Sequence, residues 1–180
     1  MKVRHKVFIS YHHYNDQFYR DLFERLFAVY YDIIVSKSVQ IGDIESNLLV
    51  NTVRQKIRDE YLGDSTVTVV LVGTETWKRK HVDWEISSSI RNTSNNPRSG
   101  LLGILLPTHE SYQNKTYNEY TVPPRLCHNQ KCGFANIYNW NEDPNIVGNW
   151  INLAFHNRFK VEPDNSYPNY VNNRSGERWY

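Results

Sequence analysis

One stretch of the sequence decides the fold class: Ser65-Thr66-Val67-Thr68-Val69-Val70-Leu71-Val72-Gly73. Its residues from Thr66 to Val72 are β-branched or apolar almost without interruption, which is typical of a short strand buried on both faces. Such strands occupy the centre of a parallel sheet that helices cover on both sides. The stretch therefore predicts an α/β protein built around a parallel sheet.

Other short apolar segments predict the remaining strands. They lie at residues 7–11, 33–35, 101–106 and 135–138. Segments with apolar residues at helical spacing lie near residues 16–29, 44–61, 82–90 and 146–155. This alternation predicts a parallel sheet of about five strands with helices on both faces. We expect the first helix to bury one stripe of side chains, Phe18, Leu22, Leu26 and Val29.

Length and composition limit the class of protein. The chain has 180 residues, and 21 Lys and Arg against 19 Asp and Glu give a net charge of +2, which does not favour a nucleic-acid binder. No apolar run reaches the roughly 20 residues of a membrane span, and two cysteines cannot form a disulfide scaffold. We expect a cytoplasmic domain over residues 1–160, a long polar and aromatic excursion over 108–132, and a polar, irregular tail over 161–180.

Ligands of parallel α/β sheets bind at the carboxyl ends of the strands. The segments that follow the first three predicted strands are Ser10–Asp16, Gln40–Asp43 and Trp77–Glu85. They contain no GxGxxG, P-loop or GxSxG motif, so the sequence does not predict a Rossmann dinucleotide site, a P-loop or a hydrolase elbow. The strand ends offer Ser, Ser and Gly rather than clustered carboxylates, which disfavours a phosphoacceptor receiver.

Glu85 is the strongest catalytic candidate. It stands one residue before Ile86, beside the helix side that Val82 and Ile86 mark as buried. A carboxyl group at the rim of the ligand crevice would be partly buried, which raises its pKa and suits it to catalysis. An ordinary exposed helix glutamate is the alternative.

These segments together resemble a known family. Phe8-Ile9-Ser10-Tyr11 with Asn15-Asp16, the strand at 65–73, and Trp77 through Trp84-Glu85-Ile86 resemble a TIR-like domain, more specifically the TIR-like subunit of bacterial Thoeris antiphage defence systems. The resemblance covers roughly residues 5–155. It implies a flavodoxin-like sheet and an NAD glycohydrolase or ADP-ribosyl cyclase that cleaves NAD at the nicotinamide–ribose bond. Glu85 matches the family's catalytic glutamate.

Six residues around Glu85 are candidates for substrate binding: Phe8, Ser10, Tyr11, Asp43, His81 and Trp84. Ser10 is expected to contact the diphosphate or the ribose. The aromatic rings are candidates for stacking on nicotinamide or adenine, with packing in the core as the alternative. Asp43 either touches a ribose or caps a helix. His81 is a departure, because many TIR domains have Trp at that position, four residues before the glutamate.

NAD is expected as the substrate, with no cofactor and no metal. The product is expected to be an ADP-ribose signal, cyclic where water is excluded, that activates a partner effector protein. The resemblance further implies a phage-derived trigger and self-association on activation, and it implies neither a nucleic acid nor a membrane as partner. The alternative is a non-catalytic TIR-type scaffold that acts through protein–protein interaction.

Several polar features have two interpretations. The basic run Lys78–His81 either receives a phosphate near a helix N-terminus or is simply solvated, which is the commoner case. His12 and His13 are either acid–base groups or loop residues. The segment Cys127–Cys132 has two cysteines and a histidine, but it lacks a clear fourth zinc ligand. The aromatic tail from Tyr167 to Tyr180 is either an assembly surface or a disordered end.

Overall fold

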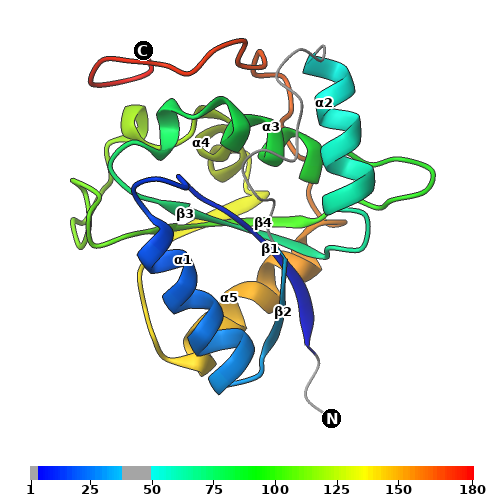
Figure 1. Ribbon diagram of the computed structural model, residues 1–180, viewed down its shortest axis with the longest axis vertical. Helices are drawn as coiled ribbons and strands as arrows, with labels where there is room; N and C mark the ends of the chain where they lie inside the picture. Colours follow the sequence, from blue (N-terminus) through cyan, green and yellow to red (C-terminus); the bar gives the residue numbers. More distant parts are fainter. Residues whose placement is uncertain (1–3, 38–49) are drawn as a thin grey trace.

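The computed structural model of the chain describes residues 4–37 and 50–180. Its centre is a sheet of five parallel strands in the order β2-β1-β3-β4-β5 (Figure 1). The strands are β1 (His5–Ser10), β2 (Ile34–Lys37), β3 (Val67–Val72), β4 (Gly100–Leu105) and β5 (Ala135–Asn139). All six residues of β3 are buried. The predicted α/β parallel sheet is therefore confirmed, and its strand order is flavodoxin-like.

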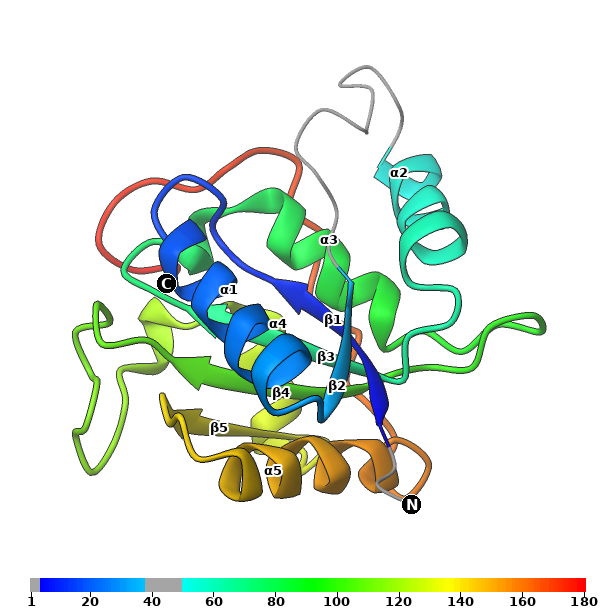
Figure 2. The same cartoon turned by 60° about the horizontal axis from the view of Figure 1, so that its bottom comes forward.

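One face of the sheet packs against α1 (Gln17–Glu24) and α5 (Pro144–Asn157) (Figure 2). A π-helical turn over Arg25–Tyr30 continues α1. α5 approaches β4 closely, because a Cβ atom on Gly100 would lie only 2.1 Å from the carbonyl oxygen of Ala154. Glycine at the start of β4 therefore allows this helix to lie directly on the sheet.

The buried stripe of α1 differs from the predicted one. Phe18 and Val29 are 67% and 73% exposed, whereas Phe23 and Phe27 are fully buried in the core under α1. A spacing of three and four residues fits either of two neighbouring stripes of this helix, and the phenylalanine pair occupies the core side. The two rings pack at 4.7 Å between centroids, which favours this side of the helix.

The opposite face of the sheet packs against α2 (Val50–Lys56), α3 (Lys80–Ser89) and α4 (Pro124–Lys131) (Figures 1 and 2). A π-helical turn over Ile57–Tyr61 continues α2. The predicted start of this helix, at Ile44, lies outside the described residues. In residues 4–37 and 50–180, no helix has both the length and the apolar character of a membrane span.

The predicted excursion over residues 108–132 is wrong for its second half. This part contains a 3-10 turn, Glu119–Thr121, and then α4. Pro124 does not prevent the helix, because the first helical positions leave their N–H groups without intrahelical partners. The few apolar residues of α4 give a weak periodicity, so the sequence pattern did not predict a helix here.

Residues 161–180 form no helix or strand, yet they pack on α3 and α4, on the side of the sheet that these helices cover (Figure 1). Tyr170 is buried, and its hydroxyl donates to the carbonyl oxygen of Trp77 over 2.9 Å. The indole N–H of Trp179 donates to the carbonyl oxygens of Glu119 and Val122. The tail is therefore irregular in backbone but packed against its own chain.

Candidate active site

Glu85 meets Ser10 at the carboxyl end of the sheet. Side chains alternate along β1, so Ser10 points to the same face as Phe8, which is the face that α3 covers. α3 follows β3, and β3 is the neighbour of β1. The hydroxyl of Ser10 donates to Oε2 of Glu85 over 2.5 Å. The fold thus brings together two predicted site residues that are 75 positions apart in the chain.

The carboxyl group of Glu85 lies in a dry environment. The residue is 3% exposed, and burial raises the pKa of its carboxyl from 4.5 to about 8. The hydrogen bond from Ser10 opposes this rise, because it stabilises the charged form. No cationic side chain of the described residues forms an ion pair with Glu85. A positively charged ligand group beside this carboxyl would stabilise its charged form.

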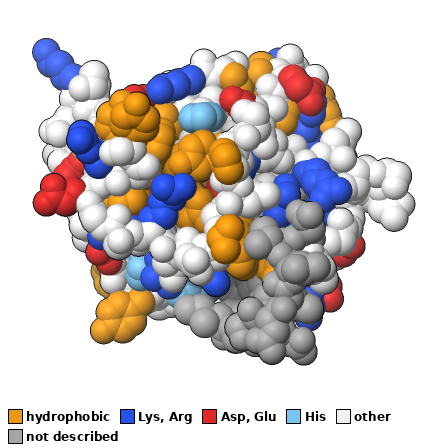
Figure 3. Space-filling model, turned by 90° about the horizontal axis from the view of Figure 1, so that it is seen from above, with side chains coloured by type: hydrophobic (Ala, Val, Ile, Leu, Met, Phe, Trp, Pro, Cys, Tyr) orange, Lys and Arg blue, Asp and Glu red, His pale blue; other side chains and the backbone are white. Residues whose placement is uncertain are grey.

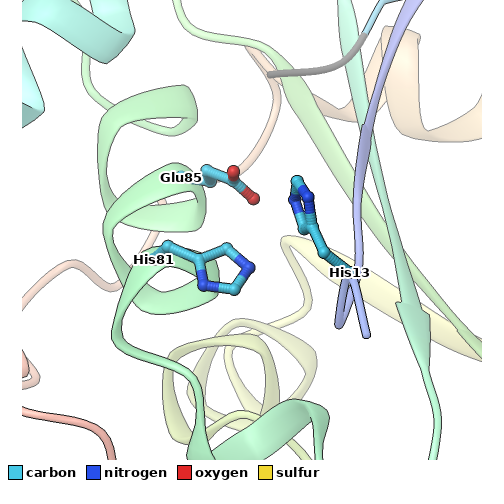
Figure 4. Close-up of side chains that lie close together, drawn as sticks. All are labelled: His13, His81 and Glu85. Atoms are coloured by element: carbon cyan, nitrogen blue, oxygen red, sulfur yellow. The ribbon is translucent and has the colours of Figure 1, made fainter. Parts of the chain in front are cut away.

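Two histidines lie beside this carboxyl group. The side chains of His13 and His81 point toward Glu85 from the β1–α1 loop and from α3 (Figure 4). Nε2 of His81 donates to the carbonyl oxygen of Tyr11 over 3.2 Å, which ties α3 to the β1–α1 loop. Burial lowers the pKa of both imidazoles to about 4. Both rings are therefore neutral near pH 7.

Within the described parts of the chain, His13, His81 and Glu85 are the group whose donor atoms lie close enough to hold a metal ion, all within 4.8 Å of one another. Two imidazoles and a carboxylate are a ligand set that zinc accepts. The positive charge of Arg79 reaches both imidazoles, which opposes a metal ion at this place. The absence of a metal from the function stays a prediction.

The predicted aromatic residues lie in the core around the site rather than on an open surface. Phe8 is fully buried and packs in the cluster that joins α2, β1 and α3, and Trp84 belongs to the same cluster. The indole N–H of Trp84 donates to the carbonyl oxygen of Tyr170 over 2.7 Å. The ring of Tyr11 stacks on His13 at 4.3 Å between centroids, so it reaches the site through that histidine.

Asp43, the remaining predicted substrate contact, lies outside the described residues. Asp16 occupies the N-cap position of α1 but makes no side-chain cap bond, and it is instead buried against Gly73 and Thr76. Burial raises the pKa of its carboxyl to about 6. Asp16 therefore joins the loops after β1 and β3 at the same edge of the sheet.

His13 is the site residue that sequence reasoning did not favour. Its neighbour His12 is not part of the group that His13 forms with His81 and Glu85, and Nδ1 of His12 accepts the backbone N–H of Asn15 over 3.0 Å. Adjacent histidines in a polar loop carry no signal that distinguishes one from the other. Only the course of the β1–α1 loop places the ring of His13 against Glu85 (Figure 4).

The opposite side of α3 makes a structural contact with α4. Asp83 pairs with Arg125 of α4 at 3.0 Å, and both side chains are almost fully buried. Arg125 also donates to Asn165, Tyr167 and Asn169 of the tail. One helix therefore carries a fixed ion pair toward the tail and an unpaired carboxyl toward the end of β1.

A comparison with protein families identifies the chain. A family model described as Thoeris protein ThsB, TIR-like domain, matches residues 8–111, more than half of the sequence. The match includes the end of β1 with Ser10, the central strand β3, and α3 with Glu85. No curated protein matches the chain. The chain belongs to the family of the Thoeris protein ThsB, TIR-like domain, and is a TIR-like protein of that defence family.

Proposed function

We propose that this protein cleaves the bond between nicotinamide and ribose in NAD, with Glu85 as the catalytic residue. The observation that carries the proposal is the buried carboxyl group of Glu85, which Ser10 holds and no cation of the described residues neutralises. In a water-excluded site, such a group stabilises a positive charge that develops beside it. Membership of the TIR-like family supports NAD as the substrate.

The reaction needs one carboxylate and no general acid for the leaving group. The C1′–N bond breaks, and its electron pair moves to the cationic ring nitrogen, so nicotinamide leaves as a neutral molecule. The positive charge passes to the ribose in an oxocarbenium-like state. The carboxylate of Glu85 stabilises this charge and accepts hydrogen bonds from the ribose hydroxyls. Addition of water at C1′, with loss of its proton, then gives ADP-ribose.

A cyclic product forms when a nucleophile of the same ADP-ribosyl group attacks C1′ in place of water. Exclusion of water from the site favours this outcome, and the burial of Glu85 supports it. We propose that this nucleotide activates a partner effector protein. We also propose that a phage-derived trigger and self-association switch the enzyme on.

Substrate entry requires the two imidazole rings to move. Glu85 is covered, and the rings of His13 and His81 lie against it (Figure 4). Since both imidazoles are neutral near pH 7, they do not repel the cationic nicotinamide ring. The hydrogen bond between His81 and Tyr11 is the contact that opening of this cover breaks.

Incubation with NAD, followed by mass-resolved chromatography of the products, tests the proposal. The wild-type protein is expected to release nicotinamide together with ADP-ribose or a species lighter by one water. Glu85→Gln keeps the shape of the side chain but removes its charge, so we expect a 10²- to 10³-fold lower turnover, the size of effect typical of a lost electrostatic group. Glu60→Gln, on the exposed end of the α2 segment, is the matched control and is expected to leave turnover unchanged.

Wild-type turnover in Glu85→Gln would overturn the assignment. The assay is run at low and high protein concentration and with lysate of infected cells, because the proposed enzyme responds to a trigger. If the wild-type protein remains without turnover in all of these conditions yet self-associates, the scaffold interpretation replaces catalysis.

A further inference from the structure

The basic run Lys78–His81 is only partly neutralised by its own chain. Nζ of Lys78 pairs with Glu75 at 2.8 Å, and Nζ of Lys80 lies 5.2 Å from the ring centroid of Trp84. Arg79 stands between them and is half-buried. In the part of the chain that the structure describes, its guanidinium forms no ion pair, and its Nε has no hydrogen-bond partner. Arg79 is thus the cation of this run that has no anionic partner among the described residues.

Arg79 lies at the edge of the candidate active site. It occupies the N-cap position of α3, six residues before Glu85, which corresponds to about 9 Å along the helix axis. Its positive charge lowers the pKa of His13 and of His81, the two rings that cover Glu85. The N-terminal end of α3 adds a partial positive charge at the same place.

The neighbouring cation, Arg20, is already in ion pairs. Its guanidinium contacts Glu24 at 2.6 Å and Asp21 at 3.2 Å. Across the face seen in Figure 3, Lys and Arg side chains lie among hydrophobic ones, while acidic side chains lie mostly near the margin. Among the described residues, Glu85 and Arg79 are thus a buried carboxyl and a nearby guanidinium that both lack an ion pair.

We propose that Arg79 binds the diphosphate of the nucleotide substrate. This inference rests on the proposed function and extends it to a second part of the NAD molecule. The diphosphate of NAD is attached to the 5′ carbon of the same ribose whose C1′ bond breaks, so the anionic group and the reacting bond lie at the two ends of one sugar. The spacing of Arg79 and Glu85 along α3 suits that arrangement. A guanidinium binds phosphate oxygens through two parallel N–H···O bonds.

Binding of ADP-ribose tests the inference without any need for turnover. Isothermal titration of the wild-type protein with ADP-ribose is compared with Arg79→Gln, Arg79→Lys and Lys78→Gln. We expect Arg79→Gln to weaken binding about tenfold to a hundredfold, the usual effect of losing hydrogen bonds to a charged group. Arg79→Lys keeps the positive charge but loses the paired N–H donors of the guanidinium, so its affinity for ADP-ribose is expected to lie between those of wild type and Arg79→Gln. Lys78→Gln changes the net charge equally, yet it alters a side chain that Glu75 already engages, so we expect less than a twofold effect.

Turnover of two substrates shows which part of the ligand Arg79 contacts. Nicotinamide riboside has the same reacting bond as NAD but no phosphate. Arg79→Gln is expected to raise the KM for NAD tenfold or more and to leave kcat/KM for nicotinamide riboside within about twofold. An equal loss for both substrates would mean that Arg79 only shapes α3, and this would overturn the inference. A thermal melt of each variant checks that it remains folded.

The two proposals fail in different ways. Weakened ADP-ribose binding in Arg79→Gln, in a protein that never cleaves NAD, would overturn the proposed function and support the diphosphate site. NAD cleavage that depends on Glu85 but is indifferent to Arg79 would do the reverse. Failure of the wild-type protein to bind ADP-ribose at millimolar concentration would overturn the diphosphate site directly.

Discussion

Asp83 and Glu85 are two buried carboxyl groups on one helix, two residues apart, and their surroundings are opposite. Asp83 is 2% exposed and pairs with Arg125, which is 1% exposed. Glu85 is equally buried, but its recorded hydrogen bond is to a neutral hydroxyl, that of Ser10. A buried ion pair fixes the position of a helix, whereas a buried acid without a cation costs stability until a ligand supplies one. The side of α3 that carries Asp83 is therefore a structural side, and the side that carries Glu85 is here called its chemical side, because it holds the proposed catalytic group.

The structural side also secures the tail. The backbone N–H of Tyr170 donates to Oδ2 of Asp83 over 2.9 Å, and Oδ1 of Asn173 accepts the first N–H of α3, that of Lys80. Each of these two hydrogen bonds joins α3 to a residue of the tail that is far away in the sequence. The tail therefore helps to hold the helix that carries Glu85.

The largest expected effect comes from breaking the pair on the structural side. Asp83→Asn or Arg125→Met is expected to lower the free energy of unfolding by about 3–5 kcal/mol, because each leaves one buried charge without its partner. Urea denaturation measures this loss. The double variant Asp83→Asn/Arg125→Met is expected to lose less than the sum of the two single variants, since neither charge then remains.

The control for this prediction is an exposed ion pair. Arg4 and Asp32 are 50% and 61% exposed, so Asp32→Asn is expected to change the free energy of unfolding by less than about 1 kcal/mol. Equal losses in Asp32→Asn and Asp83→Asn would contradict the contrast between a surface pair and a buried one.

Removing the carboxyl on the chemical side of α3, that of Glu85, is expected to raise the free energy of unfolding rather than lower it. The folded protein keeps a proton on Glu85 up to about pH 8, whereas the unfolded chain releases it near pH 4.5. Between these values the folded state binds more protons, so stability falls as the pH rises. Glu85→Gln removes this penalty, so its free energy of unfolding is expected to exceed that of wild type by roughly 4–5 kcal/mol near pH 8.5.

Denaturation of wild type and Glu85→Gln across pH 5 to 9 measures this gain, which is expected to shrink toward pH 5. His13 and His81 have pKa values of about 4 in the folded protein and 6.5 in the unfolded chain, and both proteins share this contribution, so it cancels in the difference. Glu60→Gln again serves as the surface control. A stability difference that does not change with pH would show that Glu85 is ionised in the free protein.

The smallest expected effect comes from Ser10. Its hydroxyl stabilises the charged form of Glu85, so Ser10→Ala is expected to raise the pKa of that carboxyl above about 8, by about one unit. The pH at which kcat/KM for NAD reaches half its maximum should move upward by the same amount, because the charged carboxylate is the active form in the proposed mechanism.

Ser87→Ala is the matched control for this shift. Ser87 is fully buried on the same helix, and in the described part of the chain its hydroxyl has no hydrogen-bond partner. Its removal should leave the pH profile of kcat/KM unchanged. An identical shift in both variants would mean that the effect spreads through α3 and does not depend on the bond to Glu85.

Much of the fold could be predicted from local pattern. The apolar run from Thr66 to Val72 is long enough to identify a central strand, and the alternation of strands and helices then restricts the topology. The prediction failed where the pattern was ambiguous or weak. Two stripes of α1 satisfy the same spacing, and α4 has too few apolar residues to show a period.

The sequence by itself determined the parallel sheet, the position of Glu85 on the helix after the central strand, and the family, because each depends on residues that are close together in the chain. Only the tertiary structure decided which partners these residues meet. The hydroxyl of Ser10 and the ring of His13 come from the end of β1 and the loop after it, and the guanidinium of Arg125 comes from α4. The pKa of a buried group depends on such distant neighbours, and so no local pattern could distinguish the paired Asp83 from the unpaired Glu85.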